Sequence, residues 1–192
     1  MKVIDYYFSP VSPWTYLGHG RVAEMAPRHG ATINAKPVDY GVIFPVSGGL
    51  PLGKRAPQRQ AYRLMELARW RDHLGLPLTI QPKFFPVDGT QAAHLICGAP
   101  EAARMAVAGD LLAAVWAREE NISEAGALAS VATRHGIGDV AAAIEKGKAV
   151  YQANTQEGLA RNVFGAPTYV YRDELFWGQD RLEFLERALA RS

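Results

Sequence analysis

The sequence predicts an α/β protein in which a β-α-β segment and a β-β-α segment flank a long helical stretch. Strand-like and helical patterns alternate over residues 2–39, and two short strand-like runs precede an amphipathic helix over residues 167–189. The residues between them carry mainly helical periodicity. The 192 residues are 48% hydrophobic and 21% charged, which is the ordinary composition of a folded globular protein.

The first segment contains two expected strands and one expected helix. Residues 2–8 are β-branched and aromatic, which predicts a strand. Ser12 is a favoured N-cap and Pro13 a favoured first helical residue, so we expect a helix over 13–28. Residues 31–39 predict the second strand.

The central part is expected to be helical. A glycine- and proline-rich stretch over 44–53 predicts a loop, and apolar residues at i, i+3, i+4 and i+7 from Ala61 to Ala68 predict a helix. Residues 76–89 contain three prolines and predict an irregular connector. Further helices are expected over 107–116, over 128–135, from 139 onward and over 154–162.

The last segment reads as a hairpin followed by a helix. PTYVY (167–171) and ELFWG (174–178) are separated by two polar residues and predict paired strands. The amphipathic pattern over 180–189 predicts the final helix.

This element order is the thioredoxin arrangement, in which a β-α-β half and a β-β-α half form one sheet. We therefore predict an α/β fold with a thioredoxin-like core, interrupted by a large all-helical insertion. The thioredoxin-like domain is expected to comprise residues 1–48 and 164–192, and the insertion domain residues 49–163.

Charge and cysteine content argue against several classes of protein. The net charge is only +2, with acids and bases interleaved, so we expect no nucleic-acid partner. Cys97 is the single cysteine, which excludes an internal disulfide and a cysteine-based zinc site, and the scattered histidines predict no metal site. Asp5 interrupts the first apolar run, and no apolar stretch reaches the roughly 18 to 20 residues of a membrane span. We expect a cytoplasmic protein with no membrane association.

The start of the first expected helix has the strongest chemical signal. Redox proteins of the thioredoxin type carry Cys-x-x-Cys here, whereas this chain has Ser12-Pro13-Trp14-Thr15. Hydroxyls replace both thiols, so thiol–disulfide exchange at this site is excluded. The unpaired N–H groups and the dipole of a helix N-terminus favour an anion, and a serine hydroxyl can donate to a thiolate. The alternative is that Ser12 and Pro13 only begin the helix.

Two further segments are candidates for the same site. Pro167 opens a strand that faces the helix start, where thioredoxin folds keep a cis proline that exposes the backbone of the preceding residue, here Ala166. The alternative is a trans proline at a strand edge. Asp180 and Arg181 begin the last helix and offer opposite charges to the ammonium and carboxylate of a γ-glutamyl group, or Asp180 merely caps that helix.

The Ser-Pro-aromatic motif, Val-Phe-Gly-Ala-Pro-Thr and Phe-Trp-Gly-Gln-Asp-Arg-Leu together closely resemble the 2-hydroxychromene-2-carboxylate isomerases. These enzymes are relatives of the kappa-class glutathione transferases within the DsbA-like thioredoxin superfamily. The resemblance extends over essentially the whole chain. It implies a glutathione cofactor, a small aromatic substrate and a homodimer.

The resemblance also implies roles for individual residues. Ser12 would be the catalytic residue beside the glutathione sulfur. The candidate glutathione-binding residues are Ala166, Pro167, Trp177, Gln179, Asp180, Arg181 and Lys54. Family members often have an asparagine near position 53 and a lysine soon after it, whereas this chain has Gly53-Lys54-Arg55 there.

The implied reaction interconverts 2-hydroxychromene-2-carboxylate and trans-o-hydroxybenzylidenepyruvate, a step of bacterial naphthalene breakdown. A thiolate can add to the enone so that its double bond becomes single, rotates and re-forms. Arginines between positions 55 and 71 are candidates to hold the pyruvyl carboxylate, or they form a solvated helix face. A glutathione transferase or peroxidase, and a redox-inactive peptide-binding module, remain alternatives.

Overall fold

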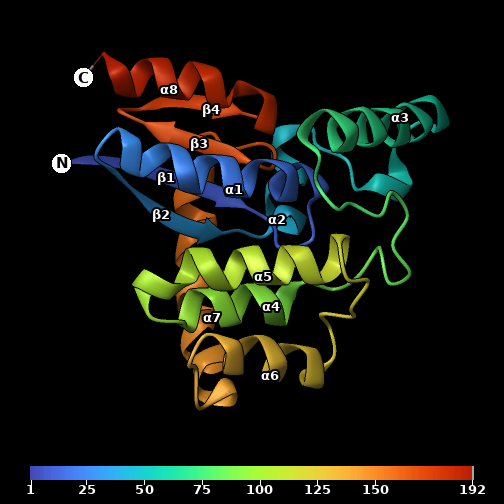
Figure 1. Ribbon diagram of the computed structural model, residues 1–192, viewed down its shortest axis with the longest axis vertical. Helices are drawn as coiled ribbons and strands as arrows, with labels where there is room; N and C mark the ends of the chain where they lie inside the picture. The colour runs from blue at the N-terminus through green and yellow to red at the C-terminus, as the bar shows by residue number, and fades with distance from the viewer. Residues whose placement is uncertain (192) are drawn as a thin grey trace.

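The computed structural model describes residues 1–191, which form one four-stranded sheet and its helices (Figure 1). The strand order is β2-β1-β3-β4. β1 pairs in parallel with β2 and antiparallel with β3, which pairs antiparallel with β4. The strands are β1 (Lys2–Phe8), β2 (Ala31–Pro37), β3 (Thr168–Tyr171) and β4 (Glu174–Trp177).

Helices cover both faces of the sheet because successive strand residues point to opposite sides. Tyr6 and Tyr169 belong to the larger core, which includes residues of α1 (Pro13–Arg28) and α8 (Leu182–Ala190). Tyr7, one residue further along β1, lies in a second cluster with residues of α2 (Tyr40–Ser47) and of the end of α7 (Val140–Ala160). The predicted thioredoxin-like core is therefore confirmed.

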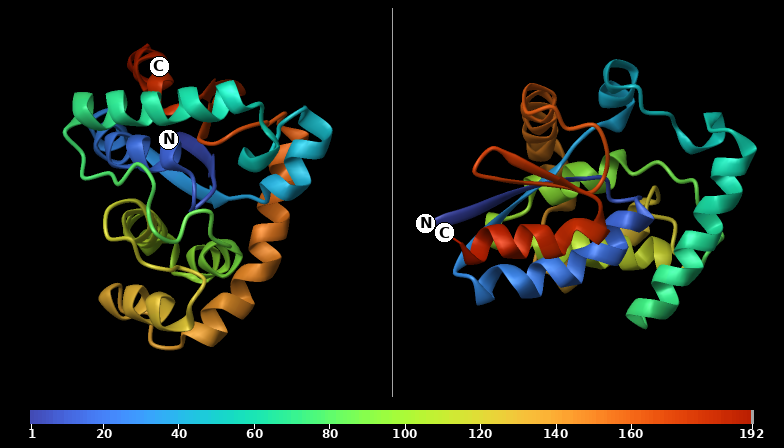
Figure 2. Two further views of the ribbon diagram at one scale, coloured as in Figure 1. Left: turned by 90° about the vertical axis from the view of Figure 1, so that its right-hand side faces the viewer. Right: turned by 90° about the horizontal axis from the view of Figure 1, so that it is seen from above.

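A large helical insertion separates β2 from β3, as predicted. Its first helix, α3, stands beside the N-terminal end of α1, whereas α4 and α5 lie next to β2, with α6 on their far side (Figures 1 and 2). Within residues 1–191, no helix has the length and apolarity needed to cross a membrane. The inserted elements before α7 are η1 (Leu52–Lys54), α3 (Pro57–Leu74), α4 (Thr90–Gly98), η2 (Glu101–Ala103), α5 (Arg104–Trp116) and α6 (Ala125–Arg134).

α7 connects the inserted layer to the sheet, and it crosses α4 at very close range (Figure 2). A Cβ atom on Gly98 would lie 1.7 Å from the carbonyl oxygen of Ala143, and one on Gly147 would lie 1.8 Å from that of His94. Both distances are far inside van der Waals contact. The crossing therefore requires glycine at both positions.

Three details of the helices differ from the prediction. α2 continues to Ser47, where the glycine- and proline-rich text predicted a loop, because Asp39 caps the helix and Ile43 is buried. α4 was not expected. α7 is one continuous helix rather than two separate ones.

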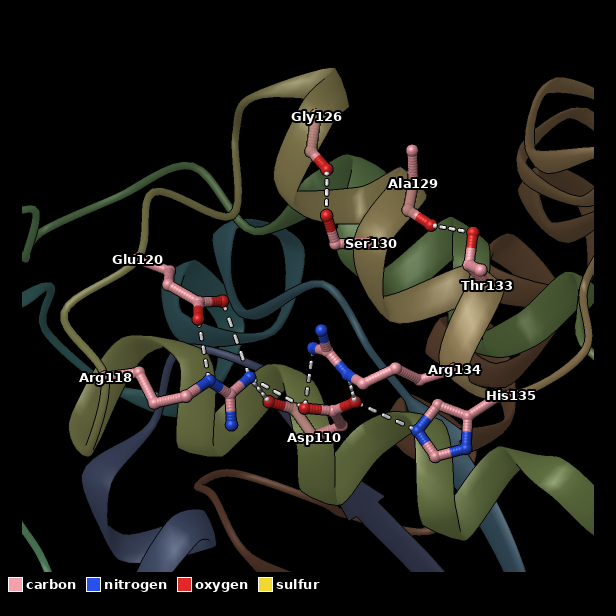
Figure 3. A network of polar contacts seen from close by, with 9 residues as sticks. All are labelled: Asp110, Arg118, Glu120, Gly126, Ala129, Ser130, Thr133, Arg134 and His135. Carbon is pink, nitrogen blue, oxygen red and sulfur yellow. Dashed lines mark hydrogen bonds and ion pairs between the residues drawn. The ribbon is translucent and has the colours of Figure 1, made fainter.

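A polar network holds α5 against α6 (Figure 3). Asp110 of α5 accepts hydrogen bonds from Arg118 at 2.7 Å and from Arg134 of α6 at 2.8 Å, and His135 lies 3.1 Å away. Burial alone would raise the pKa of Asp110, but the bonds from the two arginines outweigh it and hold the pKa below its ordinary value. Glu120 also pairs with Arg118 at 2.7 Å, so two carboxylates balance the two guanidinium groups within the fold.

Candidate functional site

Ser12 is the N-cap of α1. Its backbone is extended (φ −81°, ψ 125°), and its Oγ accepts a hydrogen bond from the backbone N–H of Thr15 at 3.2 Å. The capping interpretation of Ser12 is therefore confirmed. Since the oxygen only accepts in this bond, the hydroxyl proton remains able to point at an anion in front of the helix. The first turn of α1 contains no acidic residue that would oppose such an anion.

The peptide bond between Ala166 and Pro167 is cis, as expected from its position in the sequence. Tyr7 of β1 pairs antiparallel with Thr168 of β3. Continuing this register places Ala166 opposite Ser9, whose carbonyl oxygen accepts a hydrogen bond from the N–H of Ser12 at 3.1 Å. The serine at the helix start and the cis peptide are therefore neighbours across the end of the β1–β3 pair.

The loop that carries the cis peptide is held from both sides. The carbonyl oxygen of Gly165 accepts hydrogen bonds from the Tyr40 hydroxyl at 2.8 Å and from the Thr168 hydroxyl at 2.6 Å. The N–H of Gly178 donates to the carbonyl oxygen of Pro167 at 2.8 Å. Among residues 1–191, the backbone of Ala166 makes no hydrogen bond. It is available to pair with an extended peptide-like ligand.

Tyr40 and Thr168 were not identified from the sequence as residues of the site. Nothing in their local sequence indicates a contact with Gly165. Only the fold brings α2 and the start of β3 to the same carbonyl oxygen.

The residues that begin the last helix lie on the surface, except Gln179. Arg181 and Asp180 form an ion pair with 2.6 Å between Nη1 and Oδ2, and both side chains are about half exposed. Asp180 does not cap α8, because Arg181 is the N-cap residue and no side chain caps that helix. The capping alternative for Asp180 is therefore wrong.

Gln179 is buried, and both of its oxygens are bound within the protein. Its amide oxygen and its carbonyl oxygen both accept from Arg21 of α1, at 2.8 and 3.0 Å. A Cβ atom on Gly18 would approach the Cβ of Gln179 to 2.9 Å, so α1 and this turn pack closely. The structure places Gln179 between α1 and the start of α8, with its side-chain oxygen bound to Arg21.

The two remaining candidates are exposed. Trp177 is 52% exposed and packs against Phe164 with 4.9 Å between ring centroids. Its ring also covers Gly165, where a Cβ atom would lie 2.3 Å from the indole nitrogen. Trp177 thus forms the outer wall of the cis-proline loop. Lys54 lies exposed in η1, which precedes α3.

The arginines between 55 and 71 divide into two groups. Arg69 pairs with Glu66, and Arg71 pairs with Asp72. Among residues 1–191, no carboxylate pairs with Arg55, Arg59 or Arg63. The sequence pattern could not separate these groups, because it does not show which arginines are buried.

Two other titratable groups near the core are chemically silent at neutral pH. Burial lowers the pKa of His19 to about 4, and its ring nitrogens face the Tyr6 hydroxyl and the Met105 carbonyl oxygen. Burial raises the pKa of Cys97 to about 12, so this thiol stays protonated. Neither group supplies a base or a thiolate.

Comparison with known proteins assigns the family. Residues 3–190 match the DSBA-like thioredoxin domain, which is nearly the whole chain. The chain belongs to this family. It is similar to the 2-hydroxychromene-2-carboxylate isomerase of Sphingobium xenophagum, with 29% identity over 98% of each chain. It is also similar to glutathione S-transferase kappa 1 of Caenorhabditis elegans, with 24% identity over 95% of this chain and 88% of the other.

A solved structure of 2-hydroxychromene-2-carboxylate isomerase has the same fold, with a TM-score of 0.84 and 27% identity. The superposition covers 98% of this chain and 95% of the isomerase chain. The inserted helices therefore belong to the shared architecture, since they lie within the superposed length. These similarities confirm the resemblance that the end motifs indicated.

Proposed function

We propose that this protein is a glutathione-dependent isomerase that interconverts 2-hydroxychromene-2-carboxylate, or a related aromatic pyruvate derivative, with its ring-opened trans isomer. One observation carries the proposal: a serine hydroxyl with a free proton stands at the N-terminus of α1, beside the cis peptide between Ala166 and Pro167. Thiol–disulfide exchange has no cysteine here, whereas binding of an external thiolate has a donor.

The residues around Ser12 fit glutathione. The unpaired backbone of Ala166 suits the cysteinyl unit, and the opposite charges of Asp180 and Arg181 suit the γ-glutamyl end. Binding there would exchange the ion pair between these two residues for contacts with the ligand. Trp177 would border the site, and Lys54 adds a positive charge on the η1 side.

Bound glutathione would supply a thiolate that adds reversibly to the ring-opened substrate and lets its double bond rotate. Ser12 donates its hydroxyl proton toward the sulfur, and the N-terminus of α1 adds its partial positive charge. Both interactions favour the ionised form of a thiol whose ordinary pKa is about 8.5. The buried side of the site excludes water through Pro13 and Thr15.

A transferase of the kappa class is a second candidate, since the similarity to glutathione S-transferase kappa 1 also covers most of the chain. The two activities differ in stoichiometry. An isomerase returns the thiol unchanged, whereas a transferase or peroxidase consumes it. Measuring free thiol during turnover separates them. A redox-inactive module would bind cysteine-free extended peptides at Ala166 without turnover, and calorimetry with such peptides tests it.

We further propose that the protein acts in the cytoplasm as a homodimer on a small aromatic substrate, without a nucleic-acid or membrane partner. The support is the resemblance to the isomerases together with the nearly neutral net charge of +2. Sedimentation analysis of the purified chain measures the oligomeric state. A monomer at micromolar concentration would contradict the dimer.

The proposal is tested by replacing Ser12 with alanine. We expect the pKa of bound glutathione, followed by thiolate absorbance against pH, to rise by about one unit, since a charge-assisted hydrogen bond is lost. Turnover should fall roughly tenfold or more. Ser12→Thr keeps the hydroxyl and should restore both values.

Ser9→Ala is the matched control, because Ser9 also carries a hydroxyl in the same loop, and its Oγ accepts only a weak bond of 3.5 Å from Val11. We expect little change in this variant. An unaltered thiolate titration in Ser12→Ala would remove Ser12 from its proposed role.

A further inference from the structure

Arg63 of α3 is a buried cation without a counter-ion. Its relative exposure is 9%, and Nη2 is fully buried with no hydrogen-bond partner among residues 1–191. The guanidinium carbon lies 5.2 Å from the ring centroid of Phe85 and 5.7 Å from that of Trp116. The two rings also contact each other, with 4.8 Å between their centroids and an angle of 48° between their planes.

Two further arginines add to the same positive charge. Arg55 lies just before α3, and its Nε donates to the Leu50 carbonyl oxygen at 2.8 Å, while Arg59 lies one turn before Arg63 on α3. We call Arg55, Arg59 and Arg63 the arginine cluster. Burial, followed by repulsion from Arg55, lowers the pKa of Arg63 to about 10. Burial and repulsion from Arg59 lower the pKa of Arg55.

An uncompensated cluster of this kind is unfavourable for the protein alone. Burying a guanidinium removes its hydration, and contact with two aromatic rings returns only part of that free energy. Like charges at a spacing of four residues on a helix repel each other. A bound anion would remove both penalties, and a guanidinium fork matches the two oxygens of a carboxylate.

The arginine cluster lies on the same side of the molecule as Ser12. The connector that carries Phe85 continues to Gly89, where a Cβ atom would lie 2.7 Å from a methyl carbon of Val11. Val11 is the neighbour of Ser12 in the chain. α3 itself packs on α1, and the Tyr16 hydroxyl of α1 donates to the Pro77 carbonyl oxygen of the connector at 2.9 Å.

We propose that the arginine cluster is the subsite for the carboxylate of an aryl-pyruvate substrate, with Arg63 as its specificity-determining residue. This inference rests on the proposed function, since it assigns one end of the same substrate. The rings of Phe85 and Trp116 hold the guanidinium in place, and the carboxylate would pair with the buried Nη2, which has no partner in residues 1–191 of the protein. Substrates without a carboxylate lose this interaction.

The other arginines of α3 do not share these properties. Arg69 is 62% exposed on its side chain and already pairs with Glu66 at 2.6 Å. Arg69 therefore belongs to a solvated helix face, which is the alternative to a carboxylate-binding role that the sequence left open. Arg69→Met is the matched control for Arg63→Met, because both variants remove one arginine of the same helix.

The experiment compares two ligands that differ only in the carboxylate. Benzylidenepyruvate carries it, and benzylideneacetone has a methyl group in its place. We expect the wild-type protein, measured by calorimetry in the presence of glutathione, to bind benzylidenepyruvate ~10-fold or more tightly than benzylideneacetone. Arg63→Met should bring the ratio close to one, Arg63→Lys should give an intermediate ratio, and Arg69→Met should keep the wild-type ratio.

A wild-type protein that does not discriminate between the two ligands, or an Arg63→Met variant that still discriminates, would overturn the subsite. Circular dichroism of each variant shows that it is folded, and Arg63→Lys keeps the test valid if Arg63→Met unfolds. The isomerase proposal fails differently. In that case turnover and the Ser12-dependent thiolate titration are absent, while carboxylate discrimination by Arg63 persists.

Discussion

Two groups of arginines in the inserted region differ in whether a carboxylate of the protein pairs with them. Arg118 and Arg134 share Asp110, which accepts from both and links α5 to α6 (Figure 3). Arg55 and Arg63 have no carboxylate partner among residues 1–191, although Arg63 is the more deeply buried. The arginines that link α5 to α6 thus have a carboxylate partner within the protein. Where the opposite charge is missing, we propose that a ligand carboxylate supplies it.

The largest expected effect comes from removing the Asp110 carboxylate, which Arg118 and Arg134 share. Asp110→Asn should lower the free energy of unfolding by about 2 kcal/mol, because two guanidinium groups lose their shared partner. The loss stays below the 3–5 kcal/mol of a fully buried pair. The reason is that Arg118 and Arg134 are 37% and 47% exposed and are screened by water. Urea denaturation measures the change, and a loss under about 0.5 kcal/mol would contradict it.

The Asp110 carboxylate also predicts a pH dependence of the free energy of unfolding. The pKa of Asp110 is depressed below its ordinary value of 3.8, so the folded protein binds that proton less readily than the unfolded chain. The stabilisation is therefore complete above the ordinary pKa and is lost as the pH falls through the depressed one. The difference in stability between wild type and Asp110→Asn should shrink in that acidic range. A constant difference from pH 7 to pH 3 would argue against this account.

An intermediate effect on stability is expected when a carboxylate is introduced beside the arginine cluster. Ala56 is the N-cap of α3 but provides no side-chain cap. Ala56→Asp should raise the free energy of unfolding by about 1 kcal/mol, because it caps the helix and places a carboxylate next to Arg55 and Arg59. It should also weaken benzylidenepyruvate binding.

Ala56→Asn separates the two contributions, since it can cap α3 without adding charge. We expect it to gain most of the stability and to keep the affinity for the carboxylate ligand. Equal affinities in Ala56→Asp, Ala56→Asn and wild type would mean that the local charge does not govern ligand binding.

The smallest effect on stability is expected for Arg63→Met. The methionine retains contact with the rings of Phe85 and Trp116, and the variant no longer buries an unpaired charge. We expect the free energy of unfolding to stay within about 1 kcal/mol of the wild type or to increase. Thermal unfolding checks this directly. A loss above about 2 kcal/mol would show that Arg63 stabilises the fold, as we expect of Asp110.

The ends of the chain were predictable because their signals are local. The β-branched and aromatic run of β1, the hairpin before α8 and the Ser12-Pro13 helix start are each signals of residues a few positions apart. The cis peptide before Pro167 was expected from its place opposite that helix start. These local features were enough to predict the thioredoxin-like core and the corner that carries Ser12.

The inserted helices were harder to predict because their signals come from distant contacts. α4 is buried on most sides, so it lacks the polar face that identifies a surface helix. Gly147 interrupts the helical sequence pattern of α7. The helix nevertheless continues through this position, where α4 packs closely against it. The burial of Arg63 depends on contacts with Phe85 and Trp116, which are 22 and 53 positions away in the sequence. No local pattern contains that information.

The close crossing at Gly98 and Gly147 has a consequence for how enzymes of this shape diverge. It fastens α7 to the inserted layer, and α7 leads within a few residues into the loop that holds Ala166. The loop of the proposed glutathione site is thus attached to a helix that close backbone contacts at Gly98 and Gly147 hold in place. α3 packs on α1 away from that crossing, and Arg63 and Leu67 are its buried residues, so most of its side chains remain accessible. We therefore expect new substrate preferences to arise by replacing residues of α3, while the proposed chemistry at Ser12 is retained.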